Sequence, residues 1–177
     1  MDLVNRVAQS NIVVYDLETL WDGREITEFD IQPYLFHGLI LKELDFRKAL
    51  KEIAWTAYEN QHVAVFCSAD AVIPTWAFML VGSNLKDVAA SVVFGRRDDL
   101  IRDHFTRALA AEDWSAFQDQ VVVVKGCNSG IVPVNAYVQA QAHLQGIARR
   151  LMYGEPCSFV PTWRRPSKRQ PKLPARG

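Results

Sequence analysis

Residues 46–95 read FRKALKEIAWTAYENQHVAVFCSADAVIPTWAFMLVGSNLKDVAASVVFG, and residues 105–154 read FTRALAAEDWSAFQDQVVVVKGCNSGIVPVNAYVQAQAHLQGIARRLMYG. Aligned without a gap, 59 positions apart, the two segments are identical at 13 of 50 positions. Chance at ordinary composition gives about three identities. A fixed-period repeat of this kind indicates a duplicated structural unit. We therefore predict that the chain contains two tandem copies of one fold unit.

Both copies predict the same order of elements: a helix, an apolar strand, a second helix and a short strand. In the first copy these elements are expected over residues 44–53, 62–67, 71–85 and 91–94. In the second copy they are expected over residues 98–111, 121–125, 130–144 and 151–153. Continuous apolar runs such as VVVV are typical of strands covered on both faces, as in a parallel sheet.

This pattern predicts an α/β fold. We expect two tandem βαβ repeats, 46–95 and 105–154, to form one mostly parallel sheet with helices on both faces. The run NIVVY at residues 11–15 predicts an additional N-terminal strand at an edge. Residues 31–40 are compatible with either a strand or a short helix.

The composition divides the chain into a body and a basic tail. Residues 1–163 predict a single α/β domain, whereas residues 164–177, RRPSKRQPKLPARG, predict a disordered Pro-rich tail with six basic side chains and no acid. Over the whole chain, Lys plus Arg and Asp plus Glu each total 20. Because six of the basic residues lie in the tail, the body is mildly acidic, and we expect no nucleic-acid partner. The apolar content of 49% is compatible with a homodimer.

Three features predict a cytoplasmic protein. No apolar run approaches the stretch of about 20 residues that crosses a bilayer, so we expect no membrane partner. The first residues, MDLVNRVAQSN, lack the charged and then apolar pattern of a signal peptide. The three cysteines are an odd number without the close spacing of a disulfide framework, which is typical of a reducing compartment.

The cysteines all follow predicted strands. Cys67, Cys127 and Cys157 occur where strands 62–67, 121–125 and 151–153 give way to loops. Because parallel strands end at one edge of a sheet, where open α/β sheets bind ligands, we expect the three thiols to lie together. Thiolates suit zinc or an iron–sulfur cluster, and the candidates for a fourth ligand are His37, Asp70 and Glu155.

Two other interpretations of the cysteines stay open. Free cysteines often pack in a core as small apolar side chains. Alternatively, Cys67 or Cys127 near a helix N-terminus is a candidate reactive thiol, because the helix dipole stabilises a thiolate. His62 and His104 are expected to be structural, so neither is placed by the sequence to act as the base for such a thiol.

The loop after the second copy's first strand is a candidate anion site. In KGCNSG, residues 125–130, the backbone N–H groups of a glycine-containing turn precede a helix, and a lysine adds positive charge. The residues expected to bind the anion are Lys125, Gly126, Asn128 and Ser129. Asp70 and Ser129 occupy equivalent repeat positions, and we expect both to cap the following helix.

Four segments together resemble a known family. CSADAVIPTWAFML, VVVKGC, LMYGEPCSFVP and the upstream LFHGLILKELDFRKAL are similar to domain of unknown function family 2480, over all of the chain except the basic tail. The resemblance implies a single-domain cytoplasmic protein without an assigned activity. Genes of this family often lie near iron–sulfur assembly genes of the sulfur-mobilisation type, so the resemblance also implies protein partners from iron–sulfur assembly.

These observations lead to three functional hypotheses. The first is an accessory protein that binds zinc, another metal or an iron–sulfur cluster through the three cysteines. The second is a non-catalytic partner-binding or scaffold protein with structural cysteines. The third is a cysteine-dependent enzyme, which we favour less than a non-enzymatic role.

Overall fold

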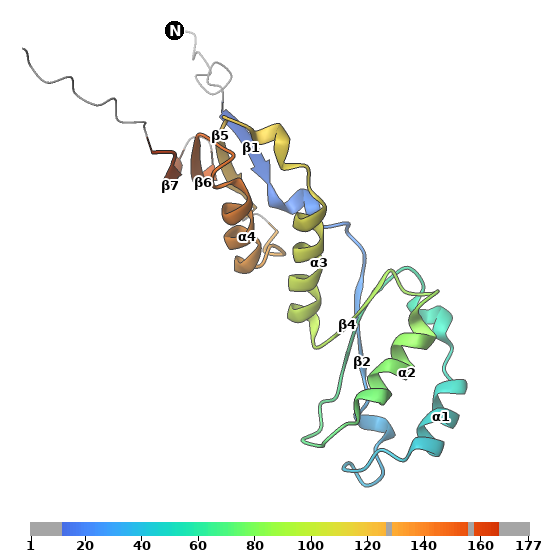
Figure 1. The fold of residues 1–177 in the computed structure, drawn as a ribbon. Coiled ribbons are helices and arrows are strands. Elements are labelled where there is room, and N and C mark those ends of the chain that lie inside the picture. The colour runs from blue at the N-terminus through green and yellow to red at the C-terminus, as the bar shows by residue number, and fades with distance from the viewer. Residues whose placement is uncertain (1–11, 127–128, 156–157, 167–177) are drawn as a thin grey trace, which may run out of the picture.

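The computed structural model describes residues 12–126, 129–155 and 158–166 (Figure 1). The described residues form seven strands and four α-helices. In chain order these are β1 (Ile12–Asp16), β2 (Ile26–Asp30), α1 (Glu43–Lys51), β3 (His62–Phe66), α2 (Thr75–Leu85), β4 (Ser91–Phe94), α3 (Arg97–Ala111), β5 (Val121–Lys125), α4 (Val134–Leu144), β6 (Arg150–Glu155) and β7 (Ser158–Arg164). None of the described helices is long and apolar enough to span a bilayer.

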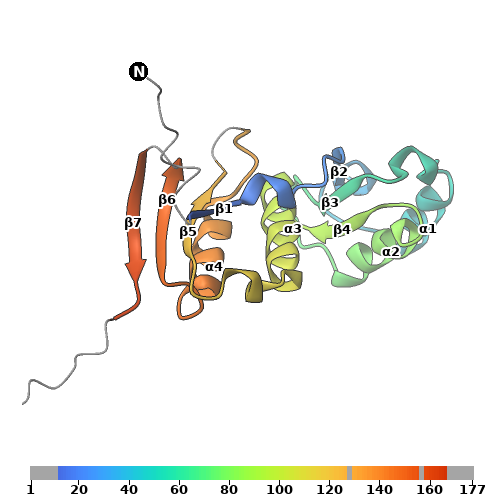
Figure 2. The same cartoon turned by 90° about the horizontal axis from the view of Figure 1, so that it is seen from above.

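The strands form two sheets, which corrects the predicted single sheet. One sheet has the order β2-β3-β4 with all strands parallel, and the other has the order β1-β5-β6-β7 with only β7 antiparallel. The physical reason is that each central strand has its own N-terminal neighbour, β2 beside β3 and β1 beside β5. The two central strands therefore never pair. The first half of the molecule is the sheet β2-β3-β4 with α1 and α2, and the second half is the other sheet with α3 and α4 (Figure 2).

Several elements of the first half are followed, 59 residues later, by an element of the same type in the second half. This spacing separates β3 from β5, α2 from α4, and β4 from β6. It also separates the short 3-10 helices Trp55–Tyr58 and Trp114–Phe117 that precede β3 and β5. The predicted N-terminal strand is confirmed as β1, at the edge of the second sheet.

Helix α3 joins the two halves. Ile101, Phe105 and Leu109 belong to the second-half core, together with residues of β5 and α4. The same helix contacts β2, β3 and β4 of the first sheet. His62 of β3 touches His104 of α3, whereas the next residue, Val63, packs in the core that includes α2. Since neighbouring strand residues point to opposite faces, α2 and α3 cover opposite faces of the first sheet.

The second helix of each half starts later than predicted. Helices α2 and α4 begin at Thr75 and Val134, and their N-cap residues are Pro74 and Pro133. Asp70 and Ser129 precede these caps, so the predicted capping role is wrong for both. Proline fixes φ near the helical value and disfavours a helical conformation in the residue before it, which places the boundary at the proline.

A carboxylate at the end of β2 and another just after β1 hold the loops that follow the central strands. In the first half, Asp30 accepts hydrogen bonds from the Ser68 backbone N–H at 2.9 Å and from its hydroxyl. In the second half, Glu18 accepts from the Ser129 N–H at 2.6 Å and from its hydroxyl at 2.9 Å. Each loop is therefore tied to the chain that leaves the neighbouring strand.

The first residues of the predicted basic tail are part of the fold. Arg164 ends β7, and the Arg165 N–H donates to the Arg149 carbonyl at 3.0 Å. The Arg165 guanidinium pairs with Asp119 and donates to the Ile147 carbonyl. Residues 167–177 lie outside the described part of the chain.

Two leucines of α3 provide a matched test of its joining role. Leu100 and Leu109 are both fully buried, but only Leu109 belongs to the second-half core. Leu100 lies one turn before His104 on the face that meets the first sheet. We expect Leu100→Ala and Leu109→Ala each to lower the free energy of unfolding by about 2–5 kcal/mol. Hydrogen exchange should increase in β3 and β4 for L100A and in β5 for L109A. Identical exchange patterns for the two variants would contradict the assignment.

Removal of the Asp30 carboxylate should give a pH-dependent loss of stability. Burial raises the pKa of Asp30, but hydrogen bonds from Ser68 and Gln32 outweigh it and hold the pKa below its ordinary value of 3.8. The carboxylate therefore stabilises the fold above pH 3.8, and this contribution is lost as the pH falls through the lowered folded value. We expect Asp30→Ala to cost about 1–3 kcal/mol at neutral pH. Urea unfolding from neutral to acidic pH, with the exposed Asp87→Ala as control, should show the difference from wild type disappearing in acid.

Candidate functional site

The structure places some of the predicted site residues and leaves others outside its described range. Cys67 directly follows β3 and is half-buried. Cys127, Asn128 and Cys157 lie outside the described residues. Glu155 is the last residue of β6 in the second sheet, whereas Asp70 is exposed in the loop between β3 and α2. His37 is exposed in the segment before α1, with its ring 4.0 Å from the Phe36 ring.

The candidate anion loop already holds a carboxylate of the same chain. Lys125 pairs with Asp16 at 3.1 Å, and this contact raises the pKa of Lys125 above its usual value. Gly126 has a φ of 148°, and a Cβ there would lie 3.1 Å from the Tyr137 hydroxyl, so glycine is required for the close approach. The Ser129 N–H donates to Glu18. An external anion would therefore have to replace the Glu18 carboxylate.

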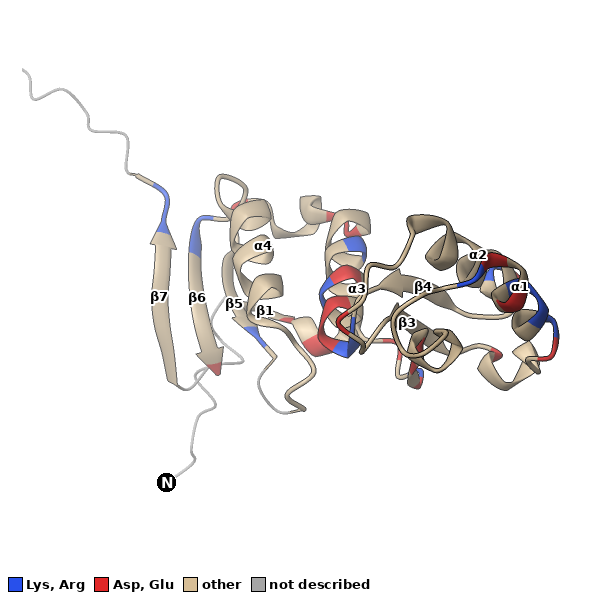
Figure 3. Cartoon of the chain, turned by 90° about the horizontal axis from the view of Figure 1, so that it is seen from below, with Lys and Arg blue, Asp and Glu red and all other residues tan. Residues whose placement is uncertain are grey.

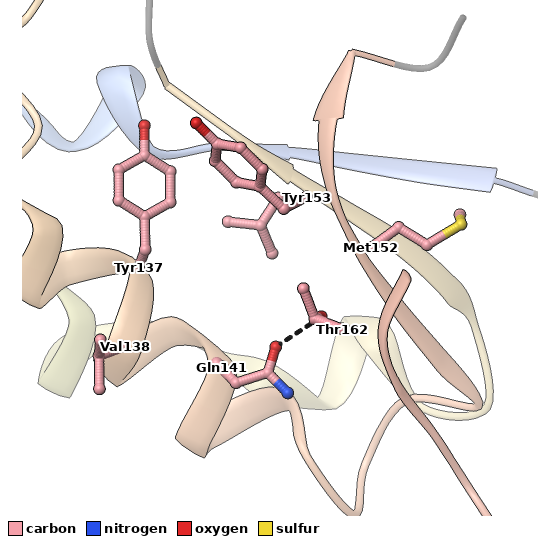
Figure 4. Close-up of a pocket in the computed structure, with 7 residues that line it drawn as sticks. Tyr137, Val138, Gln141, Met152, Tyr153 and Thr162 are labelled. Carbon is pink, nitrogen blue, oxygen red and sulfur yellow. Dashed lines mark hydrogen bonds between the residues drawn. The ribbon is translucent and has the colours of Figure 1, made fainter. Parts of the chain in front are cut away.

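An apolar groove lies between α4 and the strands of the second sheet (Figure 4). We call it the second-half groove. It has a volume of about 350 Å³. The lining residues are Val124, Tyr137, Val138, Gln141, Met152, Tyr153 and Thr162. The Tyr137 and Tyr153 rings meet edge to face at 5.5 Å, and Thr162 of β7 donates a hydrogen bond to Gln141 at 2.9 Å.

A corresponding groove lies in the first half, and we call it the first-half groove. It has a volume of about 290 Å³. The lining residues are Phe66, Cys67, Ala71, Ile73, Phe78 and Phe94. The Phe78 and Phe94 rings meet edge to face at 4.9 Å, and these residues lie 59 positions before Tyr137 and Tyr153. Both grooves therefore have an aromatic wall, made by two residues in each half that are 59 positions apart from one half to the other.

The residues that line the two grooves carry no charge. Helices α2 and α4 contain no Lys, Arg, Asp or Glu, whereas charged side chains gather on α1 and α3 (Figure 3). Phe94, in the wall of the first-half groove, is 71% exposed, and Met79, the residue after Phe78 in α2, is 70% exposed. Large exposed apolar surfaces of this kind mark interaction sites in soluble proteins.

The strand edges beside the two grooves differ. In the second half, β7 lies antiparallel on the edge of β6, with Val160 opposite Tyr153. In the first half, β4 is the last strand of its sheet, and no described strand pairs with its outer edge. An uncovered edge strand offers a row of backbone N–H and C=O groups to another chain.

A third constellation lies at the junction of the halves, where sequence reasoning predicted no site. Asp22 lies in the segment between β1 and β2, His62 opens β3, and His104 is in α3. His62 Nε2 lies 3.0 and 3.1 Å from the two carboxylate oxygens of Asp22, and its Nδ1 lies 2.7 Å from the Ser91 hydroxyl. The Trp21 ring packs against both imidazoles. No spacing in the sequence links the three residues, because only the fold brings them together.

The junction carboxylate is stabilised in its charged form. Burial raises the pKa of Asp22, but hydrogen bonds from His62 and from Arg24 outweigh it and lower the pKa to about 2. Arg24 binds Asp22 through both its backbone N–H, at 3.1 Å, and its guanidinium. His62 is 3% exposed. Among the described residues, it is the only polar or charged residue that is buried.

Comparisons with known proteins identify a family but transfer no activity. No curated protein and no solved structure matches the chain. One family model matches residues 1–165, almost all of the 177-residue chain, and its description is "Protein of unknown function (DUF2480)". The chain therefore belongs to the DUF2480 family.

Proposed function

We propose that this protein is a non-catalytic accessory protein that binds a partner protein at the first-half groove and the adjoining edge of β4. The observation that carries the proposal is the uncharged, aromatic-walled groove beside a strand edge that no described strand covers. The side chains that a partner would cover, Phe94 and Met79, are already exposed.

The likeness of the two halves suggests what this edge accepts. We propose that the halves are tandem copies of one βαβ unit, because β3, α2, β4 and the groove aromatics of the first half recur in the second half at a spacing of 59 residues. The β4 edge then corresponds to the β6 edge, which carries β7 in antiparallel pairing. The expected occupant is an extended segment of a partner protein that adds antiparallel to β4. It should place an apolar side chain opposite Phe94, as Val160 lies opposite Tyr153.

Side-chain burial would supply most of the affinity. Strand β4 has only four residues, so backbone pairing alone offers few hydrogen bonds. Burial of an exposed Phe or Met side chain contributes about 1.5–3 kcal/mol each. The free energy of binding therefore depends on Phe94 and Met79 more than on the backbone of β4.

A charged side chain at the groove should abolish partner binding. We expect Phe94→Lys to reduce recovery of the partner at least tenfold, because binding would bury an unpaired ammonium group among aromatic rings. The matched control is Val138→Lys, which is exposed at the second-half groove. The measurement is quantitative mass spectrometry of proteins that co-purify with each tagged variant from the native cells, with equal melting temperatures verified beforehand.

Unchanged recovery of all co-purifying proteins with F94K would overturn the proposal. If sedimentation velocity shows that the wild type dimerises and F94K does not, the occupant is a second copy of the chain instead of a different protein. The iron–sulfur assembly partners and the cytoplasmic location stay predictions, and identification of the recovered protein would test the former directly.

A metal or iron–sulfur centre on the cysteines is a second proposal, favoured by the parallel pairing of β5 with β6, the strands that precede Cys127 and Cys157 in the sequence. The division into two sheets changes which cysteines are expected to share the site. A shared sheet edge was the reason to expect three thiols together, but Cys67 follows a strand of the first sheet, whereas β5 and β6 belong to the second. The argument from a common edge therefore holds only for Cys127 and Cys157, which follow the neighbouring strands β5 and β6 in the sequence.

Metal content after anaerobic purification tests this second proposal. We expect the double variant Cys127→Ser and Cys157→Ser to lose the bound zinc or iron, because both thiolate ligands are gone. The single variant C67S should lose the bound zinc or iron only if Cys67 is a further ligand of the metal. Metal content measured by mass spectrometry that is equal in wild type and in the triple cysteine variant would end the proposal.

A further inference from the structure

We propose that Asp22, His62 and His104 bind a divalent transition-metal ion at the junction of the two halves. One ligand atom from each residue lies within 4.8 Å of the others. Two imidazole nitrogens and one carboxylate oxygen form a ligand set that zinc and ferrous iron use, with the remaining positions open to water or to another ligand. The proposal is independent of the partner-binding groove.

His104 is held in the tautomer that a metal ligand needs. Its Nε2 lies 2.8 Å from the Leu20 carbonyl oxygen, which can only accept a hydrogen bond. Nε2 therefore carries the proton, and in the neutral ring Nδ1 carries the lone pair. Histidines that bind metals are commonly oriented in this way, by donating the other ring N–H to a backbone carbonyl.

His62 faces Asp22 in an arrangement that requires a positive charge or a proton between them. The Ser91 hydroxyl, 2.7 Å from His62 Nδ1, can either accept from that nitrogen or donate to it. When it accepts, the Nε2 lone pair of a neutral ring points at the carboxylate 3.0 Å away. A metal ion between the two atoms, with both moving slightly apart, would bind both lone pairs. A proton on Nε2 is the competing occupant, so metal binding should release it.

Asp22 keeps lone pairs for an ion despite its contact with Arg24. An ionised carboxylate offers about four lone-pair positions. Arg24 uses one position on each oxygen, through its backbone N–H to Oδ1 and its guanidinium to Oδ2. The other positions face His62. The Asp22 side chain is 29% exposed, so it contacts solvent beside the buried imidazole of His62.

The junction cluster is separate from Cys67. His62 is the first residue of β3, whereas Cys67 follows its last residue, so the two lie about 16 Å apart along the strand at roughly 3.3 Å per residue. The three proposed ligands come from the segment before β2, from the first sheet and from α3. A bound ion would therefore cross-link the two halves and raise the melting temperature.

Cobalt and zinc titrations of the reduced, metal-free full chain test the proposal. We expect one Co²⁺ per chain with visible d–d absorption that lacks the intense charge-transfer band of thiolate ligands. Asp22→Asn and His104→Gln should each weaken Co²⁺ and Zn²⁺ binding at least tenfold, because each removes one ligand. The matched control is His143→Gln, an exposed histidine of α4 whose ring stacks on Trp114. Circular dichroism verifies that each variant is folded.

The triple cysteine-to-serine variant separates this site from a thiolate centre. Retention of the d–d bands in that variant, with their loss in D22N and H104Q, supports the junction site. The proposal is overturned if the triple variant binds no Co²⁺ or Zn²⁺, or if D22N and H104Q bind these ions as tightly as H143Q. Should the triple variant fail to fold, equal d–d absorption in D22N, H104Q and the wild-type chain overturns the proposal as well.

Discussion

The parallel pairing of β1 with β5 is the contact on which the rest of the architecture depends. It brings Ile12 beside Val121, across more than one hundred residues. Because β1 belongs to the second sheet and β2 to the first, the segment from Trp21 to Glu25 must pass from one half to the other. That passage lays Trp21 against His62 and His104 and sets Asp22 beside the His62 ring. Without this pairing, the junction cluster would lose one of its three contributors.

The two grooves differ in the aromatic residues that form their walls. Phe78 and Phe94 form the wall in one half, and Tyr137 and Tyr153, 59 positions later, form it in the other. The tyrosine hydroxyls extend toward the same end of their groove (Figure 4). In the second half, β7 and the hydrogen bond from Thr162 to Gln141 close the side of the groove. In the first half, no described strand pairs with the outer edge of β4, and Phe94 on this strand is exposed. One half thus presents a groove walled by tyrosines beside a paired strand edge, and the other a groove walled by phenylalanines beside an edge that no described strand pairs with.

The sequence predicted local structure well and non-local structure poorly. The strands that contain VVVV and SVVF were predicted with their observed bounds, since burial on two faces leaves a continuous apolar pattern. Strands β2 and β7 were missed. ITEFD mixes charged and apolar residues, and SFVPTWR contains a proline, which is tolerated because β7 is an edge strand. The division into two sheets could not be predicted, because no local sequence pattern specifies that β5 pairs with β1 and not with β3. The histidine cluster was missed for the same reason.

The pairing of the first strand with the fifth also has a consequence for the order of events during synthesis. On a ribosome, β2, β3 and β4 emerge close together, so the first half can assemble early. Strand β1 leaves the ribosome before all of them, yet its partner is translated only after α3. The apolar segment IVVY of β1 therefore has no strand partner until β5 has been synthesised. During that interval the nascent chain is exposed to misassembly, and slow, long-range closure of the second sheet completes the fold.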